Sequence, residues 1–109
     1  MSKHKDFATD IPRATETDVT YAKRLEQEGQ REIYIRKALR AHFDMTIEEV
    51  IETCATLNRA RGYELNVLRS RFPALTEARF AYKIAQTLTI PKDEARDWAK
   101  KIIAAEDKG

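Results

Sequence analysis

The sequence predicts an all-α protein, built as one small single-domain bundle of about five helices. Three observations lead to this prediction. The chain has 109 residues, 42% of them hydrophobic, which is enough for one modest core but not for two. Charged residues make up 35% of the chain, and Gly and Pro occur three times each, a composition typical of helices. Apolar residues also recur at helical spacing, and no segment is long enough to predict a strand.

The N-terminal half is predicted to contain a flexible arm followed by two helices. Residues 1–16 mix charge and Thr without periodicity, which is typical of a loose arm. Thr17 is a suitable N-cap for the first helix, and a second helix is predicted from about Gln30 to Phe43. Between them lies a polar stretch that contains Gly29, where we expect either a break or a solvated helical segment.

The next helix is predicted to begin at Thr46. Thr46 and Glu49 have the spacing of a capping box, in which each side chain accepts a hydrogen bond from the other residue's backbone N–H. Gly62 stands where a left-handed C-terminal cap is expected, because glycine adopts a positive φ without strain. A short separate helical piece is then predicted before Pro73.

Two regular helices are predicted at the C-terminal end, from Leu75 to Leu88 and from Pro91 to about Ala105. Pro91 suits a helix start because its missing N–H is no loss there. The helical domain is therefore expected to span residues 17–106, with residues 107–109 as a frayed tail.

The sequence argues against catalysis and against a metal or cofactor site. His4 and His42 have no neighbours at metal-ligand spacing, and the chain contains no glycine-rich phosphate loop. Cys54, the single cysteine, lies among apolar residues and is interpreted as a packed thiol in a reducing cytoplasm. No signal peptide or membrane span is predicted, so we expect a cytoplasmic protein. Because catalytic motifs are lacking, we expect no enzymatic activity.

The segment Arg79 to Ile102, RFAYKIAQTLTIPKDEARDWAKKI, resembles the helix-turn-helix of DNA-binding proteins. Six positions of the motif require apolar or small residues so that its two helices pack closely. Suitable residues occupy all six: Ile84, Ala85, Leu88, Ile90, Ala95 and Trp98. The turn departs from the pattern, because Thr89 replaces the usual glycine and a β-branched residue is strained in a left-handed conformation.

The resemblance implies a small regulator of prokaryotic or mobile-element genes that binds double-stranded DNA as a homodimer. The residues expected to face the bases form the outward side of the last helix: Lys92, Asp93, Arg96, Asp97 and Lys100. The residues expected to contact phosphates form a basic cluster before and within the motif: Arg59, Arg61, Arg69, Arg71, Arg79 and Lys83. The surface expected to form the dimer contains Tyr21, Leu25, Ile35 and Leu39, which serve equally well as the monomer's core.

Two other interpretations use the same residues differently. An ordinary helical hairpin also places Ala, Ile and Leu at these spacings, with the arginines as solvated side chains. The chain is then a helical interaction module that binds another protein through an acidic helix face, formed by Asp44, Glu48, Glu49 and Glu52. RNA binding through the arginines is a weaker alternative, because the sequence shows no aromatic stacking platform.

Overall fold

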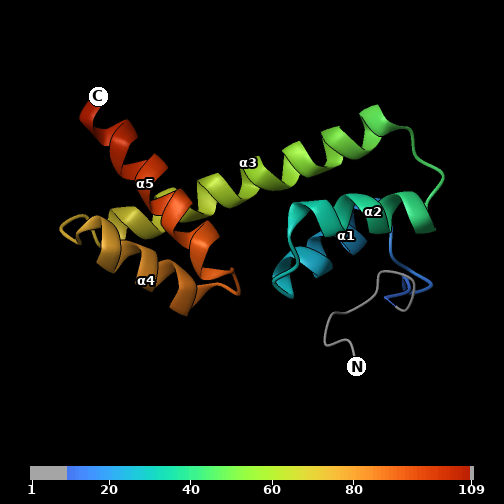
Figure 1. Cartoon of the computed structure of the whole chain (residues 1–109), viewed down its shortest axis with the longest axis horizontal. Coiled ribbons are helices and arrows are strands. Elements are labelled where there is room, and N and C mark those ends of the chain that lie inside the picture. Colours follow the sequence, from blue (N-terminus) through green and yellow to red (C-terminus); the bar gives the residue numbers. More distant parts are fainter. Residues whose placement is uncertain (1–9, 109) are drawn as a thin grey trace. The chain divides into compact units, whose positions relative to one another are not determined.

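The computed structural model describes residues 10–108 and consists of five α-helices (Figure 1). No strand occurs among these residues, so the predicted all-α class is confirmed. The helices are α1 (Asp18–Gln27), α2 (Glu32–His42), α3 (Ile47–Arg71), α4 (Glu77–Thr87) and α5 (Lys92–Lys108).

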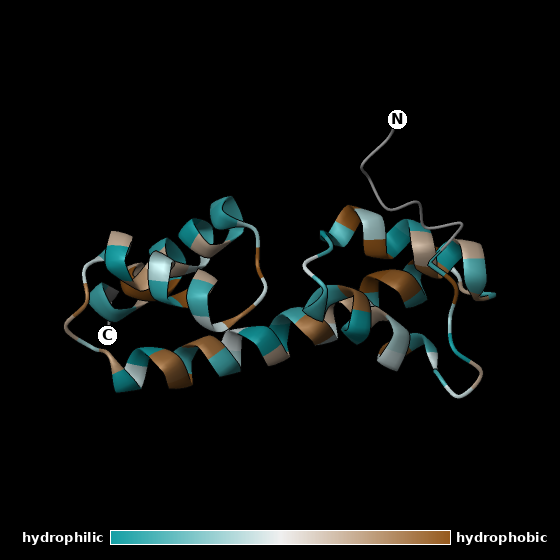
Figure 2. Ribbon diagram, turned by 90° about the horizontal axis from the view of Figure 1, so that it is seen from below, coloured by the Kyte–Doolittle hydropathy of each residue, from teal (hydrophilic) through white to brown (hydrophobic). Residues whose placement is uncertain are grey.

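The chain divides into two compact units, residues 1–57 (unit 1) and residues 58–109 (unit 2). Each unit has its own cluster of buried hydrophobic side chains. The first part of α3 belongs to unit 1 and the remainder to unit 2. The sequence predicted a single core, whereas the structure distributes the apolar residues over two small ones. Hydrophobic and hydrophilic positions alternate along the helices (Figure 2), as expected for helices with one buried side.

In unit 1, α1 packs on α2 across the break predicted at Gly29. Thr17 caps α1 as predicted, since its side chain accepts a hydrogen bond from the backbone N–H of Thr20. Gly29 has a φ of 89°, a left-handed conformation that suits glycine and lets the chain turn into α2. The ring of Tyr21 packs edge-on against His42, the last residue of α2.

The residues predicted to form the dimer surface are instead the centre of this core. Tyr21, Leu25 and Leu39 are fully buried, and Ile35 is nearly so. The helical stripe that contains them covers the neighbouring helix of the same chain, so the predicted dimer surface is wrong. A dimer therefore needs a different surface.

Part of the predicted flexible arm also belongs to this unit. Residues 1–9 of the arm lie outside the described residues, but Asp10 is buried and its backbone carbonyl accepts a hydrogen bond from the hydroxyl of Tyr21. The guanidinium of Arg24 binds Glu16 through two hydrogen bonds of 2.7 and 3.0 Å and reaches Asp10 at 3.4 Å. Residues 10–16 are thus held against α1, because one cation bridges two carboxylates that are remote in sequence.

The capping box at the start of α3 is present as predicted. The backbone N–H of Thr46 donates to Glu49 at 2.8 Å, and that of Glu49 donates to the Thr46 hydroxyl at 3.2 Å. The predicted end of this helix is wrong, because α3 continues through Gly62 to Arg71. Gly62 has no positive φ and instead lies beneath the ring of Trp98, whose nearest atoms would be 3.6 and 3.7 Å from an added Cβ.

In unit 2, α4 and α5 pack on each other and share a buried cluster with Leu65 of α3. Thr76 caps α4, and α5 begins after Pro91, whose carbonyl accepts a hydrogen bond from the N–H of Ala95. Both starts lie close to their predicted places. Helix α5 extends to Lys108, so most of the predicted frayed tail is helical.

Candidate nucleic-acid interface

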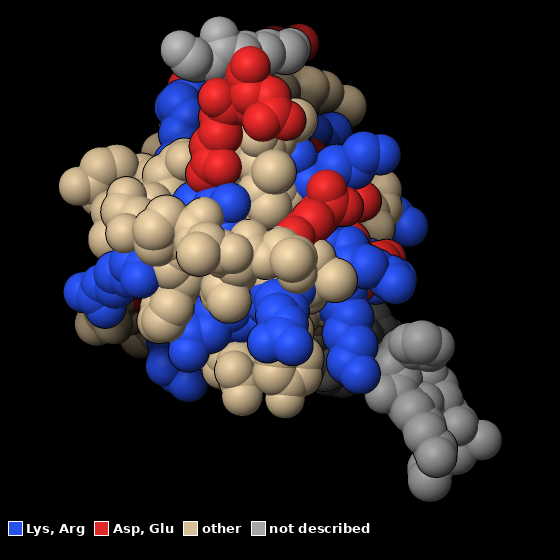
Figure 3. All heavy atoms as spheres, turned by 90° about the vertical axis from the view of Figure 1, so that its left-hand side faces the viewer, with Lys and Arg blue, Asp and Glu red and all other residues tan. Residues whose placement is uncertain are grey.

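The two units carry charges of opposite sign. Unit 2 contains eleven Lys and Arg against seven Asp and Glu, a net charge of +4. Unit 1 contains nine Lys and Arg against eleven Asp and Glu, a net charge of −2. Figure 3 faces unit 2 and shows basic side chains around much of that surface. A small net charge for the whole chain therefore conceals a basic unit, which suits an acidic partner such as nucleic acid.

The inner side of the α4–α5 pair contains the residues predicted from the helix-turn-helix resemblance. Ile84, Ile90 and Ala95 are buried in the core of unit 2, while Ala85, Leu88 and Trp98 are half-buried against it. This packing is common to a helix-turn-helix and to an ordinary helical hairpin. It fixes which side of α5 faces outward.

The turn between the two helices is built without a left-handed residue. Leu88 is extended, with φ −122° and ψ 149°, and its carbonyl accepts a hydrogen bond from the N–H of Ile90 at 2.9 Å. Thr89 lies between them, and within the described residues only glycine has a positive φ. This hydrogen bond spans two residues and makes Thr89 the centre of a γ-turn, and because the φ of Thr89 is not positive a β-branched residue is accommodated, unlike in the glycine turn of the motif.

The five residues predicted to face DNA bases all lie on the exposed side of α5. Lys92, Arg96 and Lys100 follow one another at intervals of four residues and form one row along the helix, here called the basic row. Within the part of the chain that the structure describes, none of these three side chains takes part in an ion pair. Asp93 and Asp97 lie beside them in a parallel row.

The arginines predicted to contact phosphates fall into two groups. Arg59, Arg71 and Arg79 are exposed. Arg61 and Arg69 are each only 8% exposed, and their burial argues against a direct phosphate contact. The sequence analysis did not separate the groups, because these arginines form one basic cluster before and within the motif and only the packing of unit 2 distinguishes them.

Arg69 is committed to contacts within unit 2. Its Nε donates to Glu106 Oε2 at 2.7 Å and its Nη2 donates to Oε1 of the same carboxylate at 3.1 Å. Its Nη1 donates to the carbonyl of Leu75 at 2.8 Å, and the guanidinium lies over the ring of Phe80 at 5.1 Å. The hydrogen bonds between the two side chains raise the pKa of Arg69 and lower that of Glu106. Arg69 therefore stabilises the fold of this unit.

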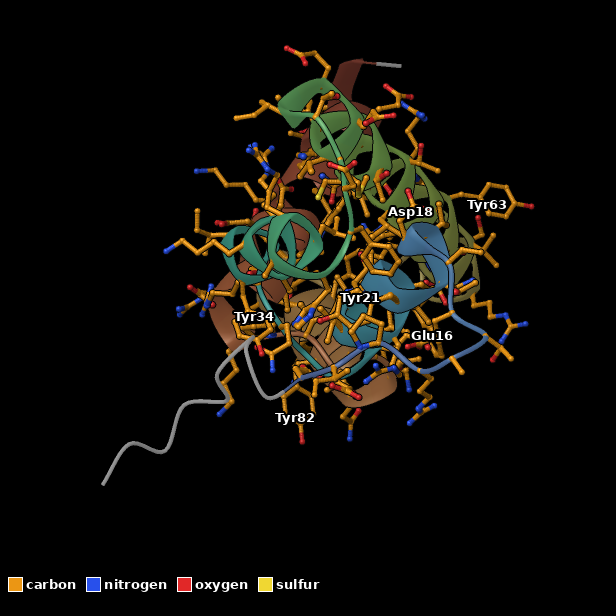
Figure 4. The ribbon with its side chains drawn as sticks, turned by 90° about the vertical axis from the view of Figure 1, so that its right-hand side faces the viewer. Glu16, Asp18, Tyr21, Tyr34, Tyr63 and Tyr82 are labelled. Atoms are coloured by element: carbon orange, nitrogen blue, oxygen red, sulfur yellow. The ribbon has the colours of Figure 1, made fainter. Side chains whose placement is uncertain are left out.

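Sequence reasoning missed a groove of about 470 Å³ beside α4. It is lined by aromatic, aliphatic and basic side chains, namely Phe72, Leu75, Ala78, Arg79, Tyr82 and Lys83. Tyr82 is 67% exposed and points away from the helices (Figure 4). Lys83 is half-buried and its ammonium lies 4.5 Å from the ring of Phe72. Residues 79, 82 and 83 have the spacing of one side of a helix, and this spacing is the sequence pattern that could have predicted the groove.

The acidic residues of the alternative interpretation are all exposed in unit 1: Asp44, Glu48, Glu49 and Glu52. Glu49 also caps α3, so it has a local structural role. Beside these acids, Ile47 and Ile51 are 57% and 45% exposed, which the sequence pattern did not predict. The acidic face therefore borders an apolar surface.

Other kinds of site are not evident in the described part of the chain. There, no three His, Cys, Asp or Glu side chains are grouped so as to hold a metal ion. Cys54 is buried, as predicted, and this burial raises the pKa of its thiol. None of the described helices has the length and apolar character required to cross a membrane. No known family model, curated protein or solved structure matches the chain.

Proposed function

We propose that unit 2 binds double-stranded DNA, with α5 in the major groove, and that the chain acts as a small regulator of transcription or of a mobile element. The observation that carries this proposal is the basic row Lys92, Arg96 and Lys100, which is exposed and forms no ion pair among the described residues. Three unengaged cations along one helix are a suitable surface for phosphates.

The dimensions of α5 support the proposal. Lys92 and Lys100 are eight residues apart, about 12 Å along a helix, which is comparable to the width of the major groove of about 12 Å. Their long side chains extend this reach on both sides. The basic row is therefore long enough to reach phosphates at the edges of the groove.

The carboxylates beside the basic row restrict how α5 can approach DNA. Asp93 and Asp97 repel phosphates, but a carboxylate accepts a hydrogen bond from the amino group of cytosine. The favoured orientation directs these two residues toward the bases and the basic row toward the backbone, so the proposal assigns to phosphates three residues that the resemblance placed at the bases. Arg71 and Arg79 are exposed cations of the same unit and supply further phosphate contacts in this proposal.

The proposal is tested by the affinity for a fluorescently labelled, mixed-sequence DNA duplex at low salt. A variant with Lys92→Ala, Arg96→Ala and Lys100→Ala is compared with a control that removes the same charge from unit 1, Arg13→Ala, Lys23→Ala and Arg31→Ala. We expect the first variant to bind about 100-fold more weakly and the control to differ little from the wild type. No binding by the wild type at low salt contradicts the proposal.

A second candidate function is docking of another protein on the acidic face of unit 1. The exposed Ile47 and Ile51 beside Glu48 favour it, because protein interfaces combine an apolar centre with a charged rim. Recovery of one dominant partner by the wild type, and its loss with Glu48→Lys, supports this function. Such a result together with no DNA binding replaces the first proposal.

A further inference from the structure

Unit 1 has an apolar groove between α2 and the start of α3, here called the α2–α3 groove. Its volume is about 420 Å³, and it is lined by side chains of both helices: Arg36, Lys37, Arg40, Ala41, Ile47, Val50 and Ile51. Ile47 and Ile51 are substantially exposed on its α3 side. Isolated surface isoleucines are common, but two on successive turns beside a groove form a continuous apolar surface.

The α2 side of the groove is basic. Lys37 and Arg40 are exposed and make no ion pair with any other residue that the structure describes. Arg36, one position away, is already paired with Glu32 on its own helix. Lys37 and Arg40, here called the basic wall, are therefore the cations available to a molecule in the groove.

The α3 side of the groove is bordered by acids. Ile47 and Ile51 lie next to the core-facing Val50 on the helix surface. Glu48 and Glu52 each follow one residue later, about 100° further around the helix and away from the core. Asp44, exposed just before α3, adds a third carboxylate near the same end. Asp44, Glu48 and Glu52 are called the acidic row.

The surface therefore has three parallel zones, namely the basic wall, the apolar groove and the acidic row. A twofold axis that runs along the groove turns a second copy so that its acidic row faces the basic wall of the first, and the reverse. The same operation brings the exposed isoleucines of the two copies together. The surface is thus complementary to itself, which is the requirement for a twofold-symmetric dimer.

We infer that two copies of this chain associate through the α2–α3 groove. An unrelated acidic segment would satisfy only the basic wall and would meet repulsion from the acidic row, whereas a second copy satisfies both. The apolar zone is small, so the dimer is expected to be weak, in the micromolar range. This inference goes beyond the proposed DNA binding and does not depend on it, although a dimer would present two copies of unit 2 to two half-sites.

The inference is tested with the full chain by sedimentation velocity over a range of protein concentrations, without DNA. One variant reverses the basic wall, Lys37→Glu with Arg40→Glu, and another reverses the acidic row, Asp44→Lys with Glu48→Lys. Each reversal places like charges opposite each other at both contacts of the dimer. We expect each variant alone to dimerise about tenfold or more weakly than the wild type.

Mixing the two variants is the decisive step. In the mixed dimer one contact joins a wild-type basic wall to a wild-type acidic row, and the other joins two reversed sets. Both contacts are attractive, so an equimolar mixture is expected to recover dimers at the wild-type concentration. A contact with an unrelated protein, or a dimer through another surface, predicts no such recovery.

Controls separate charge complementarity from unfolding. Lys23→Glu with Arg31→Glu changes the charge of unit 1 equally outside the groove and should leave dimerisation unchanged. The milder pair Asp44→Asn and Glu48→Gln should weaken the dimer if the Lys variants unfold, and thermal melts identify that case. A wild type that stays monomeric at high concentration, or a mixture that fails to recover dimers, overturns the inference. DNA binding by a monomeric wild type leaves the proposed function intact.

Discussion

Arg69 on α3 and Glu106 on α5 form a two-point ion pair across 37 residues of sequence, with donor–acceptor distances of 2.7 and 3.1 Å. The same guanidinium also binds the carbonyl of Leu75 in the connection before α4. One side chain therefore links three segments of unit 2. Arg69 therefore has a structural role, although the sequence pattern had grouped it with the DNA contacts.

Replacing Arg69 should affect stability more than binding. Arg69→Ala removes charge-assisted hydrogen bonds and leaves the partly buried carbonyl of Leu75 with fewer donors, so we expect a loss of about 2 kcal/mol in the free energy of unfolding. Arg71→Ala, at an exposed position, should change stability little while weakening DNA binding. Chemical denaturation and DNA titration of the two variants check this contrast. Equal stability of both variants would show that the Arg69 contacts contribute little.

Gly62 should tolerate a side chain, because it lies inside α3 and has no positive φ. An added Cβ would make ordinary van der Waals contact with the Trp98 ring at 3.6 and 3.7 Å. Gly62→Ala is therefore expected to stabilise the protein by about 0.5–1 kcal/mol, since alanine loses less entropy in a helix. Thermal denaturation measures the effect. A marked destabilisation would instead indicate the left-handed cap that the sequence pattern predicted.

Thr89 provides the corresponding test for the turn between α4 and α5. Because its backbone is not left-handed, Thr89→Gly relieves no strain and adds freedom to the unfolded chain. We expect a loss of about 0.5–1 kcal/mol in the free energy of unfolding. A gain in stability on the same measurement would imply a left-handed residue, as in the glycine turn of a helix-turn-helix.

Acid should weaken unit 1 through Glu16. Its hydrogen bonds to Arg24 lower the pKa of the Glu16 carboxyl from 4.5 to about 2. A group whose pKa is lowered in the folded state contributes its full stabilisation above its unfolded pKa and loses it as the pH falls through the folded pKa. The stability difference between wild type and Glu16→Gln should therefore shrink between pH 4.5 and pH 2. Denaturation at several pH values checks this, and a difference independent of pH would contradict it.

Local signals in the sequence predicted the helix starts well. The backbone groups at the helix starts are satisfied by near neighbours in sequence. Thr17 and Thr46 exchange capping hydrogen bonds with residues three positions later, and Pro91 has no N–H that needs a partner. A short segment of sequence therefore contains the information. The same reasoning failed at Gly62, because the helix continues through this position and packs it beside the ring of Trp98, which is remote in sequence. Where a helix end or the role of a glycine depends on tertiary contacts, the local sequence is not enough to predict it.

The candidate site shows the same division between local and remote information. The helix-turn-helix resemblance implied the outward side of α5, and the structure exposes the whole basic row. Which arginines are available did not follow, because Arg61 and Arg69 are buried by packing that joins distant segments. The α2–α3 groove was missed for a related reason, since it depends on where α2 lies beside α3, and helical spacing does not show that Ile47 and Ile51 stay exposed there.

The most direct test of the central claim, that α5 holds DNA phosphates with its basic row, is the salt dependence of DNA binding. Each phosphate contact contributes about 0.9 to the slope of log affinity against log salt concentration. Removing Lys92, Arg96 and Lys100 together should therefore reduce the magnitude of the slope by about 2 to 3, whereas the unit 1 control with the same loss of charge keeps the wild-type slope. An unchanged slope in the α5 variant would contradict the account.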